Sequence, residues 1–312
     1  MRILYSVIWW LVLPFVLFRL YWRGRREPGY REHIPERFGF FPAIHPAGRR
    51  IWVHAVSVGE TRAAEPLIRA LMSRFPDCEI LLTHMTPTGR ATGHELFQNE
   101  KKSGRLVQVY LPYDTNMMMR RFIRHYRPCL CILLETEIWP NLIRQCTCHQ
   151  VKLALVNARL SERSLKKGKK IRSIMNEAAR GFSVVAAQTE TDADRLGQFG
   201  AGNIAVTGSV KFDIEPSATA LVKGMKLREC IGNRPVLMCA STRNGEEARI
   251  LDVLEQLDRN ALLLLVPRHP QRFDDVAGMI RNRKIPMIRR STLHDLSANA
   301  LSPDTRILLG DS

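Results

Sequence analysis

The sequence predicts an α/β protein built on parallel sheets. Short runs of β-branched residues or leucine alternate with longer amphipathic segments, which is the pattern of strands joined by crossover helices. The strand-like runs are continuously apolar, as expected when helices cover both faces of a sheet. Eleven such runs are too many for one sheet of this kind, so we expect two Rossmann-like lobes.

The expected elements follow one another from residue 51 onward. Strands are expected at 51–56, 79–84, 106–111, 130–135, 152–157, 183–188, 203–208, 235–241, 261–267, 284–288 and 306–311. Helices are expected at 60–75, 114–126, 138–149, 164–180, 190–199, 244–259 and 270–283. In the first helix, Ala64, Leu67, Ile68 and Leu71 recur at the spacing of one helix face.

The region near 208–234, where TGSVKFDIEPSA occurs, is typical of a connection between lobes. We therefore expect an N-terminal anchor at 1–22, a first domain at 23–208 and a second domain at 209–312. In folds of this kind ligands bind beyond the carboxyl ends of the strands, so the informative residues should follow the strands directly.

Composition excludes two classes of protein and predicts a kind of partner. With 312 residues, 45% of them apolar, the chain has ample material for a core and is not intrinsically disordered. No apolar run after residue 20 approaches the roughly 20 residues of a spanning helix, which excludes a multi-span membrane protein. The net charge of +17 predicts an anionic partner: nucleic acid, a phosphate-bearing substrate or an acidic membrane.

Cysteine usage indicates a reducing compartment. The seven cysteines are Cys78, Cys129, Cys131, Cys146, Cys148, Cys230 and Cys239. An odd, scattered set is not a secreted disulfide framework. The two C-x-C pairs lack the C-x2-C spacing of structural zinc sites, so we expect free thiols and no metal.

The N-terminus predicts attachment to a membrane. Residues 3–18 are almost wholly apolar and are followed by Arg19, Arg23, Arg25 and Arg26. A signal peptide has the opposite order of charge and apolar stretch, and the positive-inside rule places the rest of the chain in the cytoplasm. Sixteen residues rise only about 24 Å as a helix, short of a ~30 Å hydrocarbon core. A short spanning anchor and an interfacial helix both remain open, whereas the arginines that follow the apolar stretch argue against a buried core helix.

The first strand is followed by HAVSVGE, which places Glu60 near a helix N-terminus. A carboxylate there could take a proton from an acceptor hydroxyl, since a general base needs position first. Alternatively, Glu60 only caps its helix.

The segment ETEIWPN ends another strand with Glu135 and Glu137, which strand alternation would place on one side, next to Trp139. Two acids beside an aromatic ring could position a sugar or a basic group. The alternative is an ordinary acidic pair in a first helical turn.

Further polar residues follow later strands. Lys211 lies at the expected domain junction, and Arg268 and His269 precede a helix that Pro270 could start, an arrangement suited to phosphate. The chain ends with Gly310, Asp311 and Ser312 after another strand, a loop and cap suited to a ribose or phosphate.

Other signals restrict the choice of function. The stretch 159–180 holds eight Lys or Arg against two Glu, and forms either a solvated helix face or a surface for anionic lipid. No P-loop, G-x-G-x-x-G or G-x-S-x-G motif is present, which removes the usual sequence support for NTP hydrolysis, simple dinucleotide binding and α/β-hydrolase chemistry.

Taken together, the segments resemble the 3-deoxy-D-manno-octulosonic acid (Kdo) transferase family of lipopolysaccharide synthesis. The strings that carry the resemblance are SVGETRAAEPLIRAL, TPTGR, YLPYD, ETEIWPN, NARLSERS, AAQTETDADRLGQFGA, TGSVKFD, LVPRHPQRF and GDS, in the family's order over nearly the whole chain. The resemblance implies a glycosyltransferase of the GT-B fold, which has two Rossmann-like lobes. Such an enzyme moves Kdo from CMP-Kdo to the lipid A precursor with inversion and without metal or other cofactor. It also implies a place on the cytoplasmic face of the inner membrane.

The resemblance further implies roles for individual residues. Glu60 matches the general base that deprotonates the glucosamine 6′-hydroxyl of the acceptor, and Glu135 and Lys211 match stabilisers of the transition state. The segments that match CMP contacts supply Arg268, His269, Gly310, Asp311 and Ser312.

Family members continue for about a hundred residues beyond GDS, as the resemblance implies. We therefore expect an incomplete second lobe, and the sequence leaves open whether the 312-residue chain is active or an inactive fragment. The alternatives are a membrane-associated GT-B enzyme with another nucleotide sugar, a basic nucleic-acid-binding protein and a structural membrane adaptor. The basic stretches lack interleaved aromatics and any nucleic-acid module, so no nucleic-acid partner is expected.

Overall fold

The computed structural model describes residues 2–42, 48–213, 218–254, 256–293 and 301–311. Contacts divide the chain into two compact units, Met1–Glu215 and Pro216–Ser312. Lys211, expected in the second domain, lies in the first unit.

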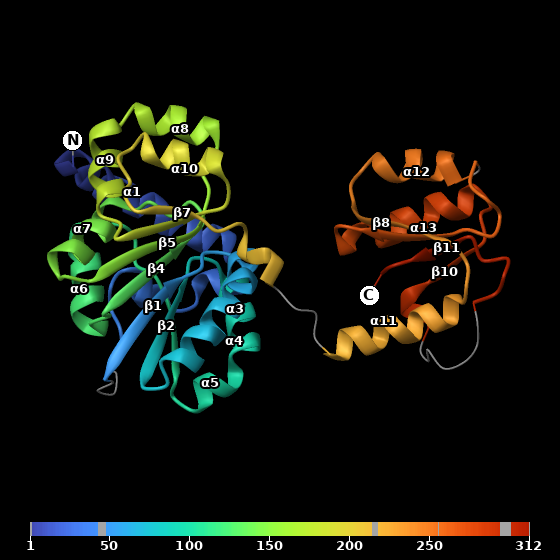
Figure 1. Ribbon diagram of the computed structural model, residues 1–312, viewed down its shortest axis with the longest axis horizontal. Helices are drawn as coiled ribbons and strands as arrows, with labels where there is room; N and C mark the ends of the chain where they lie inside the picture. Colours follow the sequence, from blue (N-terminus) through green and yellow to red (C-terminus); the bar gives the residue numbers. More distant parts are fainter. Residues whose placement is uncertain (1, 43–47, 214–217, 255, 294–300, 312) are drawn as a thin grey trace. The chain divides into compact units, whose positions relative to one another are not determined.

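The first unit is built on a seven-stranded parallel sheet with the order β3-β2-β1-β4-β5-β6-β7 (Figure 1). Its strands are β1 (Arg49–His54), β2 (Cys78–His84), β3 (Leu106–Tyr110), β4 (Leu130–Leu134), β5 (Lys152–Ala158), β6 (Val184–Ala187) and β7 (Ile204–Val206). The strand order reverses between β1 and β4, and at such a point parallel sheets bind ligands beyond the carboxyl ends of the strands.

Helices cover both faces of this sheet. They are α1 (Arg2–Arg23), α2 (Ile34–Arg37), α3 (Val58–Arg74), α4 (Pro87–Leu96), α5 (Gln98–Lys102), α6 (Asn116–Tyr126), α7 (Pro140–Cys148), α8 (Glu162–Lys169), α9 (Arg172–Arg180) and α10 (Glu190–Gly197), with the 3₁₀ helices η1 (Pro28–Arg31) and η2 (Val210–Asp213). Alternate residues of β1 enter different cores. Trp52 joins the apolar cluster under α6–α10, whereas Ile51 and Val53 join the one under α3.

Five of these helices are capped at their N-termini by a serine or threonine side chain. The capping residues are Ser57, Thr86, Thr115, Ser161 and Thr189, each accepting a hydrogen bond from a backbone N–H in the first turn. Such caps satisfy donors that the helix itself cannot, so the helices start at defined residues beside the carboxyl edge.

Helix α1 packs side-on against the first unit. Leu13 and Leu20 are buried in a small cluster with Tyr30, Tyr113 and Met118. Within the described residues α1 is the one helix long and apolar enough to cross a membrane, judged by length and composition.

The second unit has a four-stranded parallel sheet with the order β10-β11-β9-β8. Its elements are α11 (Ala218–Ile231), β8 (Val236–Thr242), α12 (Glu246–Leu254), β9 (Leu262–Pro267), η3 (Pro270–Arg272), α13 (Phe273–Asn282), β10 (Met287–Arg289), η4 (Arg290–Thr292) and β11 (Ile307–Leu309). Strand β9 is well buried, but Val236, Leu237 and Met238 of the edge strand β8 are exposed, contrary to the expectation that both faces of every strand are covered.

All eleven predicted strands are present, and the predicted class, two parallel sheets with the second smaller, is confirmed. The helix predicted over 164–180 is instead two helices, α8 and α9. In α8, Gly168 packs so closely on Phe199 that a Cβ would lie 2.6 Å from the ring. Helices α4, α5 and α11 form where no helix was predicted.

Candidate functional site

The loops after β1 and β4 bring three carboxylates to the carboxyl edge of the first unit's sheet. Glu60 lies in the first turn of α3, which follows β1, and Glu135 and Glu137 follow β4. The charges of Glu137 and Glu135 both raise the pKa of Glu60, so the three groups lie close enough to interact. Parallel strands place their carboxyl ends at one edge, and the reversal of strand order puts this group where such sheets bind ligands.

Glu60 is half-buried and held by its own loop. One carboxylate oxygen accepts the backbone N–H of Val56 at 2.7 Å, and the other accepts the Ser57 hydroxyl at 3.1 Å. The Ser57 oxygen in turn accepts the N–H of Glu60, so the capping alternative is correct as a description of the contacts.

Burial nevertheless changes the chemistry of this carboxyl group. Burial, together with the charges of Glu137 and Glu135, raises the pKa of Glu60 from 4.5 to about 7, despite the hydrogen bonds from Val56 and Ser57. A group with a pKa near neutrality can accept a proton in one step and release it in the next. Capping and proton transfer are therefore compatible at this residue.

Glu135 is held in an uncommon conformation. Its φ of 58° is in the left-handed region, although its side chain is buried and it is not a glycine. Such a conformation costs about 1–3 kcal/mol and persists when surrounding contacts determine it. Its backbone N–H donates to Val156 O at 3.0 Å.

Two cations bind the carboxylate of Glu135. Lys211 Nζ lies 3.1 Å from Oε1, and Arg159 lies 3.1 Å from Oε2. The structure thus brings together two of the predicted site residues, 76 positions apart in sequence, in the first unit. Both cations are about half exposed, so they are accessible to an anion in solvent.

The loop between β4 and α7 differs from both sequence interpretations. Strand β4 ends at Leu134 and α7 begins at Pro140, so Glu135 and Glu137 lie in the loop between them. Strand alternation therefore does not determine which side these two side chains face, and neither residue belongs to the first turn of a helix. Trp139 does lie beside Glu137, to whose carboxylate its indole N–H donates. Burial raises the pKa of Glu137, and the charge of Glu135 raises it further.

Asp114 fixes the far end of this loop. Its carboxylate accepts the N–H groups of Asn141 at 3.1 Å and Leu142 at 2.8 Å, at the start of α7. A second contact comes from α1, because the Tyr5 hydroxyl donates to the same carboxylate at 2.9 Å.

Two residues of the site were not singled out from the sequence. Asn157 is fully buried with φ 56°, and its side-chain oxygen accepts the N–H of Val210, which orients η2 and hence Lys211. Arg159 follows two residues later. The string NARLSERS contained both, and Asn is a residue that tolerates positive φ, but no pattern within one chain marks either as part of a site.

The second unit gathers the remaining predicted residues at the carboxyl edge of its sheet. Arg268 and His269 follow β9, and Gly310 and Asp311 follow the neighbouring strand β11. Arg268 and His269 are exposed, and among the described residues Arg268 forms no ion pair. The expected helix start at Pro270 is a 3₁₀ turn, and α13 begins at Phe273.

Contacts within the unit occupy the end of β11. Both carboxylate oxygens of Asp311 accept hydrogen bonds from Ser291, from its N–H at 2.8 Å and its hydroxyl at 2.7 Å. A Cβ on Gly310 would lie 2.8 Å from a methyl group of Val266, so the close approach of β9 requires glycine. Ser312, the last predicted residue, lies outside the described residues.

No cluster of three or more His, Cys, Asp or Glu that could hold a metal ion occurs in the described part of the chain. All seven cysteines are free thiols.

Comparisons with known proteins agree on one family. The family model described as "3-Deoxy-D-manno-octulosonic-acid transferase (kdotransferase)" matches residues 32–214. The 3-deoxy-D-manno-octulosonic acid transferase of Bordetella pertussis is 40% identical over 308 residues, which are 96% of this chain and 70% of that protein. The Haemophilus influenzae protein of the same name is 36% identical over all of this chain and 72% of its own length.

Solved structures agree on the fold. The UDP-GlcNAc 2-epimerase of Neisseria meningitidis, bound to UDP-GlcNAc, aligns with a TM-score of 0.53 at 11% identity, over 84% of this chain and 72% of that one. A glycosyltransferase from Rickettsia africae aligns with a TM-score of 0.51 at 13% identity, over 85% and 68%. At these identities the likeness concerns the GT-B-like arrangement of parallel sheets alone.

Proposed function

Because this chain belongs to the 3-deoxy-D-manno-octulosonic-acid transferase family, we propose that it transfers Kdo from CMP-Kdo to the lipid A precursor with inversion and without metal. The observation that most supports a mechanism is the Glu60 carboxylate, with a pKa of about 7, at the sheet edge where the strand order reverses. A base of this kind at this place is suited to activating a hydroxyl group.

The proposed reaction is a single displacement. The acceptor 6′-hydroxyl oxygen attacks the anomeric carbon of Kdo while its proton passes to Glu60. The bond from that carbon to the phosphate oxygen breaks, and CMP leaves as a phosphate monoester with the bonding electron pair. Attack on the face opposite the departing phosphate inverts the anomeric centre, through an oxocarbenium-like state.

We assign the stabilisation of this state to Glu135 and Lys211. They form a 3.1 Å ion pair in the free protein, so both charges are held in place before substrate binds. The carboxylate favours the positive charge that develops on the sugar ring, and the ammonium group favours the negative charge on the leaving phosphate. Because the groups are preorganised, little reorganisation is needed during reaction.

We assign CMP binding to the second unit. Arg268 and His269 are exposed at the end of β9, where the guanidinium group could bind a phosphate without a divalent ion. The carboxylate of Asp311 is already bound to Ser291, so we expect the contact from the last segment to come from the backbone of Gly310, Asp311 and Ser312. We place the enzyme on the cytoplasmic face of the inner membrane, where the phosphorylated acceptor is also expected.

The test is an incubation with CMP-Kdo and lipid A precursor in the presence of EDTA, with products identified by mass. We expect one or more Kdo units on the acceptor, no transfer from UDP-sugars and no effect of EDTA. Glu60→Gln should abolish transfer, and Glu95→Gln, at an exposed position on α4, should not.

The same variants are made at the aligned positions of the longer B. pertussis relative, of which this chain spans 70%. If that relative kept the parent rate of transfer when the residue at the position aligned with Glu60 was replaced, the proposed role of Glu60 would be contradicted. Transfer from a UDP-sugar would contradict the proposed donor.

A further inference from the structure

Helix α1 presents two opposite apolar stripes. One stripe faces the first unit and consists of Tyr5, Trp9, Leu13, Val16 and Leu20. Their spacing of four, four, three and four residues is that of a single helix face. Contacts anchor both ends of this stripe. Tyr5 donates to Asp114, Trp9 stacks on Tyr113 at 5.9 Å, and Leu20 is buried.

The other stripe is exposed. Leu11, Phe15, Phe18 and Trp22 follow the same spacing along the centre of the opposite face, and they are 67%, 74%, 73% and 59% exposed. Further exposed apolar residues of α1 flank them: Val7, Ile8, Trp10, Val12 and Tyr21. Large apolar side chains that share one exposed face form a patch, and such a patch marks an interaction surface. The four central residues are called the exposed face of α1.

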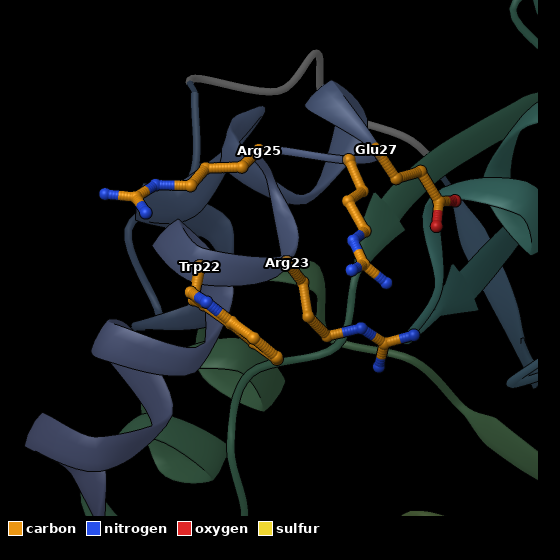
Figure 2. A pocket seen from close by; sticks show the side chains of 5 residues that line it. Trp22, Arg23, Arg25 and Glu27 are labelled. Carbon is orange, nitrogen blue, oxygen red and sulfur yellow. The ribbon is translucent and has the colours of Figure 1, made fainter.

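Arginines lie directly beyond this face. Figure 2 shows Trp22 and Arg23 at the end of α1, followed by Arg25 and Glu27, around a pocket of about 350 Å³ that Arg26 also lines. Among the described residues these three arginines form no ion pair with a carboxylate, although Arg23 lies over the Tyr30 ring at 4.2 Å. Exposed apolar and aromatic side chains next to unpaired arginines match the chemistry of an anionic phospholipid surface.

The side-on packing decides how the helix meets this surface. The inward stripe runs over most of the length of α1, from Tyr5 to Leu20, and its partners Asp114, Tyr113 and Tyr30 belong to the polar first unit. A bilayer-spanning α1 would either carry these segments into the hydrocarbon or detach from them. Charged and polar groups are costly in hydrocarbon, and detachment would break the Tyr5–Asp114 bond and expose the cluster.

We propose that α1 does not span the bilayer but lies in the plane of an anionic membrane surface, with its exposed face among the acyl chains and its terminal arginines on lipid phosphates. This inference rests on the membrane location in the proposed function, but it concerns lipid binding and not sugar transfer. The Tyr5–Asp114 bond also connects the membrane helix to the start of α7, after the loop that carries Glu135.

Two measurements test this, both without CMP-Kdo. In the first, the chain with an N-terminal epitope tag binds sealed vesicles of phosphatidylglycerol and phosphatidylcholine, and protease is added outside. An in-plane helix leaves the tag outside, so we expect its complete digestion. A protected tag would mean that α1 crosses the bilayer, which would overturn the proposal.

The second measurement is the partition of variants onto the same vesicles. Phe15→Glu together with Phe18→Glu should weaken binding about tenfold or more, because two large apolar side chains no longer enter the acyl region. The matched control is Phe75→Glu. Phe75 is an exposed phenylalanine at the end of α3, near the edge of the sheet where the strands begin. Arg25→Gln should weaken binding about fivefold on anionic vesicles and leave binding to neutral vesicles unchanged.

The alternative occupant of the exposed face is a second copy of the chain. If Phe15→Glu with Phe18→Glu dissociated a dimer in sedimentation and left vesicle partition unchanged, the membrane assignment would be wrong. Transfer activity is measured separately, so a protein that binds vesicles as expected but transfers no Kdo would refute the proposed function and not this inference.

Discussion

The raised pKa of Glu60 predicts that removing its charge stabilises the fold while it abolishes catalysis. In the folded protein this carboxyl group holds its proton up to about pH 7, whereas in the unfolded chain it titrates near 4.5. The folded state therefore binds the proton more tightly. The resulting stability is complete below pH 4.5 and is lost as the pH rises through 7.

The size of the effect follows from the same two values. At about 1.4 kcal/mol per pKa unit, the shift from 4.5 to about 7 corresponds to about 3–4 kcal/mol. Glu60 is half-buried, so solvent reduces this value, and we expect about 1–3 kcal/mol at pH 8. Glu60→Gln keeps an oxygen for the Val56 N–H and has no charge to desolvate. We expect this gain over the parent protein at pH 8 and a smaller one at pH 5.

Urea unfolding followed by tryptophan fluorescence measures this difference. All five tryptophans, at positions 9, 10, 22, 52 and 139, lie in the first unit, so the signal reports the unit that contains Glu60. Glu95→Gln, at an exposed position, is the matched control and should change stability equally little at both pH values. A loss of stability in Glu60→Gln that is the same at pH 5 and pH 8 would refute the reasoning, because it would mean that the carboxylate acts only as a cap.

Three further predictions concern other parts of the molecule. Lys211→Met should lower kcat for Kdo transfer more than it changes KM, since its charge is assigned to the transition state; a change in KM alone would contradict that assignment. Asp114→Ala should destabilise the first unit by about 1–3 kcal/mol in the same urea assay, because the N–H groups at the start of α7 lose their buried acceptor, whereas the exposed Asp77→Ala should be neutral. Gly310→Ala should destabilise the second unit by about 1–3 kcal/mol through its contact with Val266. Faster hydrogen exchange in β9 with an unchanged tryptophan signal is the expected result, and unchanged exchange would show that the strand moves aside freely.

The strands of both units were predictable because apolar runs report burial directly. The run at 51–56, for example, supplies β1, whose Trp52 and Val53 enter opposite cores. The family was recognisable from the motifs, and the comparisons confirm it. Glu60 could be singled out from the sequence because it follows the end of a strand, where parallel sheets bind their ligands.

Other features depend on contacts that no local pattern contains. The left-handed φ of Glu135 was not predictable, since glutamate rarely adopts it and only the surrounding contacts impose it. The ion pair from Arg159 requires β5 to lie beside β4, which is a property of the sheet order. Helix α11 was missed because its apolar residues Leu221, Val222 and Met225 are exposed and show no clear helical periodicity.

The open edge of the second sheet bears on how the protein behaves in solution. Strand β8 pairs with β9 on one side, and in the described part of the chain no strand lies on its other side. Backbone donors and acceptors beside exposed Val236 and Met238 form a template for strand addition from another molecule. At low ionic strength the +17 charge keeps copies apart, whereas added salt screens that repulsion over distances beyond about 10 Å. Colloidal stability should therefore fall with salt, opposite to the usual salting-in of a basic protein.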